Sequence, residues 1–184
     1  MPFTFRHLEI PEIVVVESQR YADTRGSFFE SYKQSAFAAN GLQGAFVQDN
    51  CSHSVRNVLR GLHYQKHPVA QGKLVLVAAG EIFDVAVDIR KGSPTFGRWT
   101  GARLVTSHMI YVPIGFAHGF CVVSDEATVL YKTTAEYNPE FDRGIIWNDP
   151  TLAIDWPVKE PLLSDKDRRL PTLGQADNNF VYSP

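Results

Sequence analysis

Two short motifs bring histidines together with turns and cations, the settings in which an imidazole does chemistry. Residues 113–118 read Pro-Ile-Gly-Phe-Ala-His, so a turn delivers His118 onto the apolar run that follows. Residues 59–63 read Leu-Arg-Gly-Leu-His and place the cation of Arg60 close to His63. An imidazole changes charge near neutral pH, so either histidine can act as an acid or a base. A lone histidine is more often a plain surface or core residue, so the neighbouring groups decide between these interpretations.

The motif at residues 113–118 resembles the second histidine motif of the cupins, which are small jelly-roll barrels. Metal cupins pair it with an earlier motif that supplies two histidines as His-x-His and then a glutamate. The matching region, residues 61–65, reads Gly-Leu-His-Tyr-Gln, and no glutamate follows before Gly72. Two imidazoles make a poor site for a catalytic metal, which usually has three protein ligands. We therefore expect the cupin barrel without a metal site.

The spacing of Arg60 and His63 raises a geometric problem. They are three residues apart, so a regular strand would turn them to opposite faces. Gly61 lies between them and can mark a bulge that re-aims one of the two side chains. Lys73 opens an apolar run over residues 73–78 and, taken alone, is typical of a solvated strand end.

Other polar residues have both a structural and a functional interpretation. Asp84 and Asp88 share one face of the alternating segment 81–90, whose other face is apolar. In a barrel that buries one face of each sheet they lie in solvent, unless they face a polar cavity and orient histidines or lysines. Tyr131 is typical of strand packing, and it matters chemically only if it faces the same cavity as His63. The polar clusters at 25–30 and 48–50 can bind a base and a sugar or simply stabilise loops.

The elements that must position these groups are mostly strands. Alternation and apolar runs predict strands at 13–17, 73–78, 81–90, 110–112, 119–123 and 128–134, with turn signals between them. Short helices are predicted at 35–40, before Gly41, and at 164–170, where Ser164 can cap the start. This pattern indicates an all-β fold, a cupin-like jelly-roll barrel with a few short flanking helices, in a single domain over residues 1–184. We expect the tail from Gly174 onward to be loosely held.

Composition bounds the partners and the location. Hydrophobic residues make up 44% of the 184 residues and charged residues 21%, which is enough to bury a core in a soluble protein. Eighteen Lys and Arg against twenty Asp and Glu give a net charge of −2, so we expect neither nucleic acid nor a membrane as partner. We expect no secretory signal in residues 1–12 and no membrane span. Cys51 and Cys121 form no Cys-x-x-Cys pair, so the expected location is the cytoplasm.

Seven motifs occur in an order that resembles one family. They are Arg25-Gly26-x-Phe28-x-Glu30, Gln48-Asp49-Asn50, Leu59-Arg60-Gly61-Leu62-His63, Gln71-Gly72-Lys73, residues 83–88, residues 113–120 and Leu130-Tyr131-Lys132. In this order they resemble the dTDP-4-dehydrorhamnose 3,5-epimerase family of sugar-nucleotide epimerases. The resemblance runs from about Ile10 to Leu173. It implies a dTDP-linked 4-keto-6-deoxy sugar as substrate and no cofactor.

The resemblance also implies roles for individual residues. His63 would be the base that removes the sugar C–H proton, Asp167 its partner, and Tyr131 the acid on the opposite face of the sugar. Lys73 and His118 would lie near the ketone, with Asp84 supporting this polar cluster. The residues implied in substrate binding are Arg25, Phe28, Glu30, Gln48, Asn50, Arg60, His118, Tyr137, Asp142 and Lys166. Asp142 stands where the family often has glutamate. The resemblance further implies a homodimer with exchanged N-terminal strands.

The implied chemistry suits these residue types. A ketone at C4 makes the protons at C3 and C5 acidic, and removal of one gives an enolate. Return of a proton to the other face inverts the carbon, which needs a base, an acid and a cation near the oxygen. The rival interpretations are a mono-epimerase that inverts only C3 or only C5, a metal-dependent cupin, and a non-catalytic sugar-binding cupin.

Overall fold

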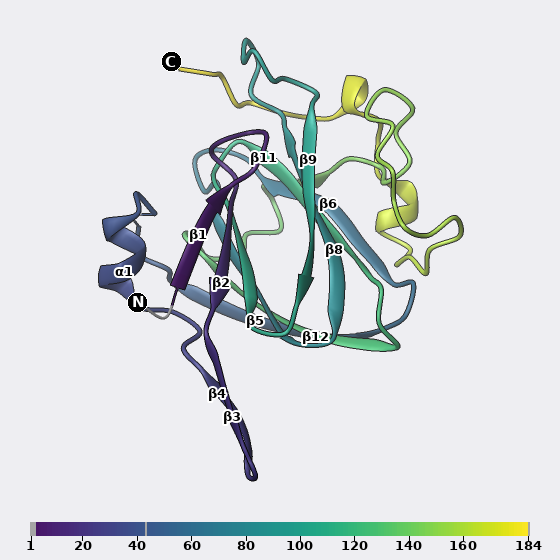
Figure 1. The fold of residues 1–184 in the computed structure, drawn as a ribbon. Helices are drawn as coiled ribbons and strands as arrows, with labels where there is room; N and C mark the ends of the chain where they lie inside the picture. The colour runs from purple at the N-terminus through teal and green to yellow at the C-terminus, as the bar shows by residue number, and fades with distance from the viewer. Residues whose placement is uncertain (1–2, 43, 184) are drawn as a thin grey trace.

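The computed structural model describes residues 3–42 and 44–183, and its framework is two antiparallel sheets packed face to face (Figure 1). One sheet has six strands, in the order β1 (Phe3–His7), β2 (Val14–Ser18), β10 (His108–Val112), β7 (Lys73–Ala79), β12 (Glu126–Thr133) and β5 (Gln48–Val55). The other has five strands, in the order β13 (Asp142–Gly144), β6 (Leu59–Gln65), β11 (Phe116–Val122), β8 (Glu81–Asp88) and β9 (Trp99–Val105). The predicted all-β, cupin-like jelly roll is confirmed.

The remaining elements are small and lie outside the two sheets. Strands β3 (Arg20–Asp23) and β4 (Gly26–Phe29) form a separate hairpin, which projects away from the barrel in Figure 1. The helices are α1 (Gln34–Ala39) and the short 3₁₀ turns η1 (Asp167–Arg169) and η2 (Leu173–Gln175). None of the helices among the described residues is long and apolar enough to cross a membrane.

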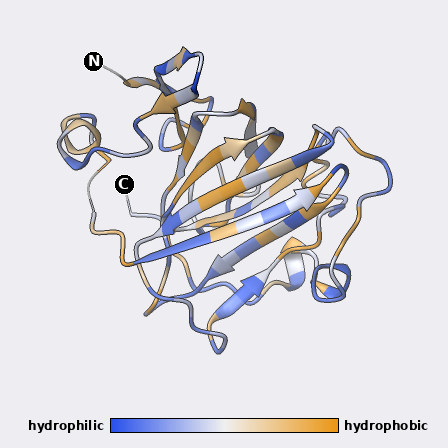
Figure 2. Ribbon diagram, turned by 90° about the horizontal axis from the view of Figure 1, so that it is seen from below, coloured by the Kyte–Doolittle hydropathy of each residue, from blue (hydrophilic) through white to orange (hydrophobic). Residues whose placement is uncertain are grey.

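The barrel interior is apolar at one end and polar at the other. Along the strands, hydrophobic and hydrophilic residues alternate (Figure 2). Side chains from both sheets, including Val15, Val75, Ile82 and Val129, form a buried cluster between them. Such burial of apolar surface contributes about 25 cal/mol per Å² and is the main term that holds the two sheets together. The polar residues of the inner faces gather at the other end, where they line a cavity.

The outer face of the five-stranded sheet is also buried, contrary to the expectation that one face of β8 meets solvent. Val85, Val87 and Ile89 pack there against the C-terminal segment, which contributes Trp156 and Phe180. Figure 1 shows this segment lying over the β6 side of the barrel. Both faces of β8 are therefore buried, and the aspartates on its inner face are enclosed.

The tail is well packed, so the prediction of a loosely held segment from Gly174 onward is wrong. The Phe180 side chain is only 3% exposed, and its carbonyl oxygen accepts a hydrogen bond from the Lys91 amide at 3.0 Å. The Tyr64 hydroxyl donates to the Asp177 carbonyl oxygen at 3.0 Å. A single aromatic residue in a polar stretch carries no periodic signal, which is why the sequence did not indicate this docking.

The predicted strands and helices correspond to observed elements. The strands predicted at 13–17, 73–78, 81–90, 110–112, 119–123 and 128–134 become β2, β7, β8, β10, β11 and β12. Gly41 follows α1 with a φ of 79°, the left-handed conformation that ends many helices. The predicted helix at 164–170 is only the single turn η1, although Ser164 does accept a hydrogen bond from the Asp167 amide at 3.1 Å.

Candidate active site

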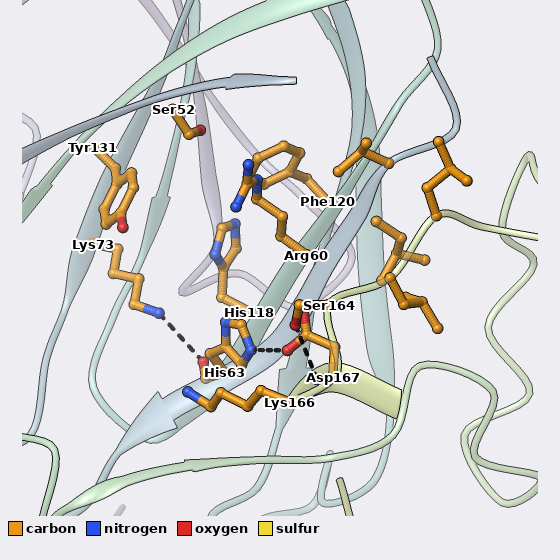
Figure 3. Close-up of a pocket in the computed structure, with 14 residues that line it drawn as sticks. Ser52, Arg60, His63, Lys73, His118, Phe120, Tyr131, Ser164, Lys166 and Asp167 are labelled. Carbon is orange, nitrogen blue, oxygen red and sulfur yellow. Dashed lines mark hydrogen bonds and ion pairs between the residues drawn. The ribbon is translucent and has the colours of Figure 1, made fainter. Parts of the chain in front are cut away.

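The polar end of the barrel encloses a cavity of about 410 Å³ (Figure 3). It is lined by Ser52, Val58, Leu59, Arg60, His63, Lys73, His118, Phe120, Tyr131, Leu162, Leu163, Ser164, Lys166 and Asp167. A second hollow of about 310 Å³ shares His63, Lys73, Tyr131 and Lys166 with it. The two hollows therefore form one continuous cleft.

A bulge in β6 brings Arg60 and His63 to the same cavity. His63 pairs with His118 on β11, whereas Arg60 pairs with Phe120, so three steps on β6 face two steps on β11. The extra residue is accommodated at Gly61, which has a φ of 122°. A Cβ atom there would lie 2.7 Å from the Cα of Gly119, closer than real contacts allow. The predicted bulge is confirmed, and glycine is required at its centre.

His63 is held by a carboxylate from a distant part of the chain. Its Nε2 lies 2.6 Å from Oδ1 of Asp167, whose side chain is 5% exposed, while the His63 side chain is 29% exposed. Burial tends to raise the pKa of Asp167, but hydrogen bonds with His63, Ser164 and the Gly61 amide outweigh it and lower that pKa below its ordinary value. Asp167 therefore stays ionised, and it fixes the orientation of an imidazole that remains open to the cavity.

His118 is bonded to a second buried carboxylate. Its Nε2 lies 3.0 and 2.9 Å from the two carboxylate oxygens of Asp84, which is fully buried. Asp84 thus orients a histidine, as one of its two interpretations expected, although it is not among the described residues that line the cavity. The solvent-exposed alternative is wrong. Asp88 is also fully buried, but it binds Arg90, Ser93 and Thr95 instead of the cavity residues.

Lys73 and Tyr131 approach the cavity from the six-stranded sheet, opposite the histidines (Figure 3). The Lys73 ammonium donates to the carbonyl oxygen of His63 at 3.3 Å. Burial lowers the pKa of Lys73 to about 8, against the nearby carboxylates of Asp142 and Asp84, which favour its charge. Burial also raises the pKa of Tyr131, so its hydroxyl is protonated at neutral pH and can donate a proton. Tyr131 also packs on the core, as its structural interpretation expects, and it lines the same cavity as His63, which is the condition for a chemical role.

A polar network lines the outer part of the cleft. Gln48 donates to Asn50 Oδ1 at 2.9 Å and accepts from the Tyr137 amide at 2.7 Å. The Tyr137 hydroxyl donates to Asp142 at 3.0 Å, and the Lys166 ammonium pairs with the same carboxylate. All five of these side chains were predicted as binding residues, and they line one hollow. An exposed aromatic ring beside amides and a cation suits a nucleotide base and its phosphates.

Three predicted binding residues lie elsewhere. Arg25 and Phe28 belong to the β3–β4 hairpin, which has its own shallow hollow, and Glu30 follows it. The Arg25 side chain is 88% exposed and Phe28 is 66% exposed. None of the three is among the described residues that line the cleft of their own chain.

Several residues that line or support the cleft were not predicted from the sequence as site residues. They include Ser52, Ser54 and Phe120 from the strands, Gln71 and Thr133 from the rim, and Ser164 as a cavity wall. The alternation of residues 48–54 was the available signal, because Gln48, Asn50, Ser52 and Ser54 share the inner face of β5. Among the described residues, no group of three His, Cys, Asp or Glu side chains is placed to hold a metal ion.

The fold and the cleft together define a class of protein. A carboxylate-held histidine on one sheet faces a tyrosine and a lysine on the other, which is the arrangement of a cupin-type acid–base enzyme. A family model described as dTDP-4-dehydrorhamnose 3,5-epimerase matches residues 7–175. The chain belongs to this family of isomerases.

Individual relatives agree with this membership. The dTDP-4-dehydrorhamnose 3,5-epimerase of Pseudomonas aeruginosa is 55% identical over 174 residues, covering 92% of this chain and 96% of the relative. The 3,5-epimerase of Legionella pneumophila, solved in complex with dTDP-4-keto-L-rhamnose, is 47% identical with a TM-score of 0.90 and covers 95% of each chain. A 3′-monoepimerase from Streptomyces bikiniensis, solved with dTDP-quinovose, is 35% identical with a TM-score of 0.85, covering 92% of this chain and 87% of that one.

Proposed function

We propose that this chain inverts C3 and C5 of dTDP-4-dehydro-6-deoxy-D-glucose and so forms dTDP-4-dehydro-L-rhamnose. The observation that carries the proposal is the placement of His63 and Tyr131 on opposite sheets around one cavity. Inversion of a carbon requires proton removal on one face and proton delivery on the other. The names of the relatives that share more than half of the sequence support the same reaction.

In the proposed first step, His63 takes the proton from C3 or C5 of the sugar. The C–H electron pair forms the carbon–carbon double bond to C4, and the ketone oxygen becomes an enolate oxygen. The Lys73 ammonium and His118 stabilise that negative charge, which is worth about 2.7–4 kcal/mol for a well-placed donor. Asp167 stabilises the imidazolium that forms on His63, since the two groups are 2.6 Å apart.

In the second step, the Tyr131 hydroxyl delivers a proton to the opposite face of the same carbon. The enolate electrons return to that carbon, the C4 ketone re-forms, and the tyrosinate is reprotonated from solvent as His63 releases its proton. These two steps move only protons, so the proposed reaction consumes no redox cofactor. The same pair then acts on the second carbon.

The nucleotide is proposed to occupy the outer hollow. Tyr137 offers an exposed ring for the thymine, and Gln48 and Asn50 offer amides for its polar edge. Lys166 lines both hollows and Arg60 lines the inner cavity, and two such cations suit the two phosphates. In this scheme the diphosphate displaces Asp142 from Lys166.

We further propose a homodimer in which each β3–β4 hairpin reaches the cleft of its partner. Arg25, at the tip, and Phe28, on β4, are exposed on a hairpin that leaves its own barrel (Figure 1). Mixing a chain that carries R25A with one that carries R60A tests this, because one of the two sites in the mixed dimer would then be intact. Recovered activity supports the exchange of hairpins between the two chains. If no activity is recovered after the subunits have been mixed and re-paired, the proposal is contradicted. A cytoplasmic location is proposed too, with both cysteines present as free thiols.

The direct test is product analysis in deuterated buffer with dTDP-4-dehydro-6-deoxy-D-glucose. The double epimerase incorporates deuterium at both C3 and C5 and yields the L-configured sugar. A mono-epimerase, which is the alternative reaction and the activity named for the 35% identical relative, incorporates and inverts at one carbon only, even after long incubation. The absence of any exchange would overturn the proposed function.

A further inference from the structure

Arg60 is the only proposed phosphate ligand of the inner cavity that comes from a strand bulge, and its head group is already bonded to one partner. Its Nε and Nη2 atoms both donate to the hydroxyl oxygen of Ser54, at 3.1 and 3.0 Å. Ser54 is 5% exposed, whereas Arg60 is exposed. Figure 3 shows the guanidinium reaching into the cavity beside Phe120.

The contact joins the two sheets. Ser54 lies on the inner face of β5, the edge strand of the six-stranded sheet, and Arg60 lies on β6 of the other sheet. The two residues flank the tight turn between these strands, in which the Val58 amide donates to the Val55 carbonyl oxygen at 3.2 Å. Ser54 therefore lies next to the turn that connects the two sheets.

The pattern of donors leaves one edge of the guanidinium free. A guanidinium has five N–H groups in a planar fork, and Nε and Nη2 form one of its two double-donor edges. Ser54 occupies that edge. Nη1 makes no hydrogen bond with any described residue, so the Nη1–Nη2 edge remains available to an anion. Phosphate oxygens favour such a bidentate edge.

From these contacts we infer that Ser54 is a positioning residue for Arg60: its hydroxyl fixes the guanidinium so that the Nη1–Nη2 edge faces the diphosphate of the nucleotide sugar. The inference rests on the proposed function, because it assigns the anion that Arg60 meets. A long arginine side chain carries much rotamer entropy, and holding it before the ligand arrives removes part of the ordering cost of binding.

The test is a double-mutant cycle on dTDP binding, measured by titration calorimetry on the full chain. We expect S54A to weaken dTDP binding about tenfold, the value of one hydrogen bond to a charged group. S54T, which keeps the hydroxyl, should bind close to the wild-type value. In an R60A background S54A should cause no further loss, because there is no guanidinium left to hold.

Turnover provides a second readout that a purely structural role would not reproduce. S54A should raise KM for the keto sugar and leave kcat near the wild-type value, because the proton-transfer groups are untouched. S54C keeps a side chain of similar volume but offers a poor hydrogen-bond acceptor. It replaces S54A in these measurements if the thermal unfolding midpoint of S54A shows that this variant is poorly folded. Unchanged dTDP affinity in S54A or S54C, or an equal loss with and without Arg60, would overturn the inference. If wild-type protein itself fails to bind dTDP, the proposed function fails first.

Discussion

Substitution of Asp167 by Asn tests the central acid–base assignment. The change preserves the shape of the side chain and removes the charge that lies 2.6 Å from Nε2 of His63. Asp167 is 3% exposed, so water has little room to replace the lost carboxylate oxygen. A positioned base contributes about 10²–10⁴-fold, and the variant keeps the base but loses its partner. We therefore expect kcat to fall about 10²-fold, or about 2.7 kcal/mol, with little change in KM.

The assay is deuterium exchange into C3 and C5 followed by mass spectrometry, with D165N as the matched control. Asp165 lies two residues earlier in the same segment and is exposed. A double variant makes the test stricter. In an H63A background, D167N should cause little further loss of exchange, because the effects of substituting residues that act as one unit are not additive. Near-normal exchange in D167N, or an equal loss in the presence and absence of His63, would refute the proposed pairing.

The D167N variant should also change the stability of the fold, in a direction that follows from the pKa of Asp167. The pKa of Asp167 is lowered in the folded protein, so this group stabilises the fold above its unfolded pKa of 3.8 and loses that contribution as the pH falls through the folded value. D167N should therefore lower the unfolding midpoint at neutral pH. The difference in unfolding midpoint between D167N and the wild type should narrow as the pH falls below 3.8.

Four further tests probe the opposite sheet, the bulge and the metal. Y131F should impair inversion by about 10²-fold or more while exchange at the sugar carbons continues, because the base still works and its proton can return to the same face; loss of both together would contradict the assignment. Since Lys73 has a pKa of about 8, activity should fall as the pH rises through that value and its ammonium is lost; K73R should move this alkaline limb upward, and an unchanged limb would speak against Lys73. G61A should destabilise the fold and reduce activity, because a Cβ at Gly61 meets backbone at 2.7 Å; a wild-type melting midpoint would show that the bulge tolerates a side chain. Activity should persist in excess chelator, and loss that one divalent metal restores would support a metal cupin instead.

The fold could be read from the sequence because several of its strands stand out as alternating or apolar segments between turn signals. Segment 81–90 carries a clear period of two, and the turn signals on either side delimit it. Alternation does not reveal what covers a face. Phe180 and Trp156 cover the outer side of β8 from far along the chain, so both of its faces are buried. The same reason explains why the tail was wrongly expected to be loose.

The site was predictable where its chemistry is local. Gly61, between Arg60 and His63, indicated the bulge, and the turn before His118 indicated the second histidine. Asp167 gave no such signal, since it lies 104 positions from His63 and no local spacing connects them. It was assigned from family resemblance alone. The hairpin residues show the opposite limit, because their motif is local but they lie outside the cleft of their own chain.

The two-sheet architecture also bears on whether one carbon or two are inverted. His63 is fixed by Asp167, and Tyr131 is fixed within β12, between β5 and β7. C3 and C5 lie on either side of C4, so one base and one acid at fixed positions reach both carbons only if the sugar ring moves between the two steps. The cavity walls that govern this movement, such as Phe120 and Leu163, take no part in proton transfer. Because a 3,5-epimerase and a 3′-monoepimerase both share this fold, we propose that the shape of the cavity wall, rather than the identity of the base and the acid, decides whether one carbon or two are inverted.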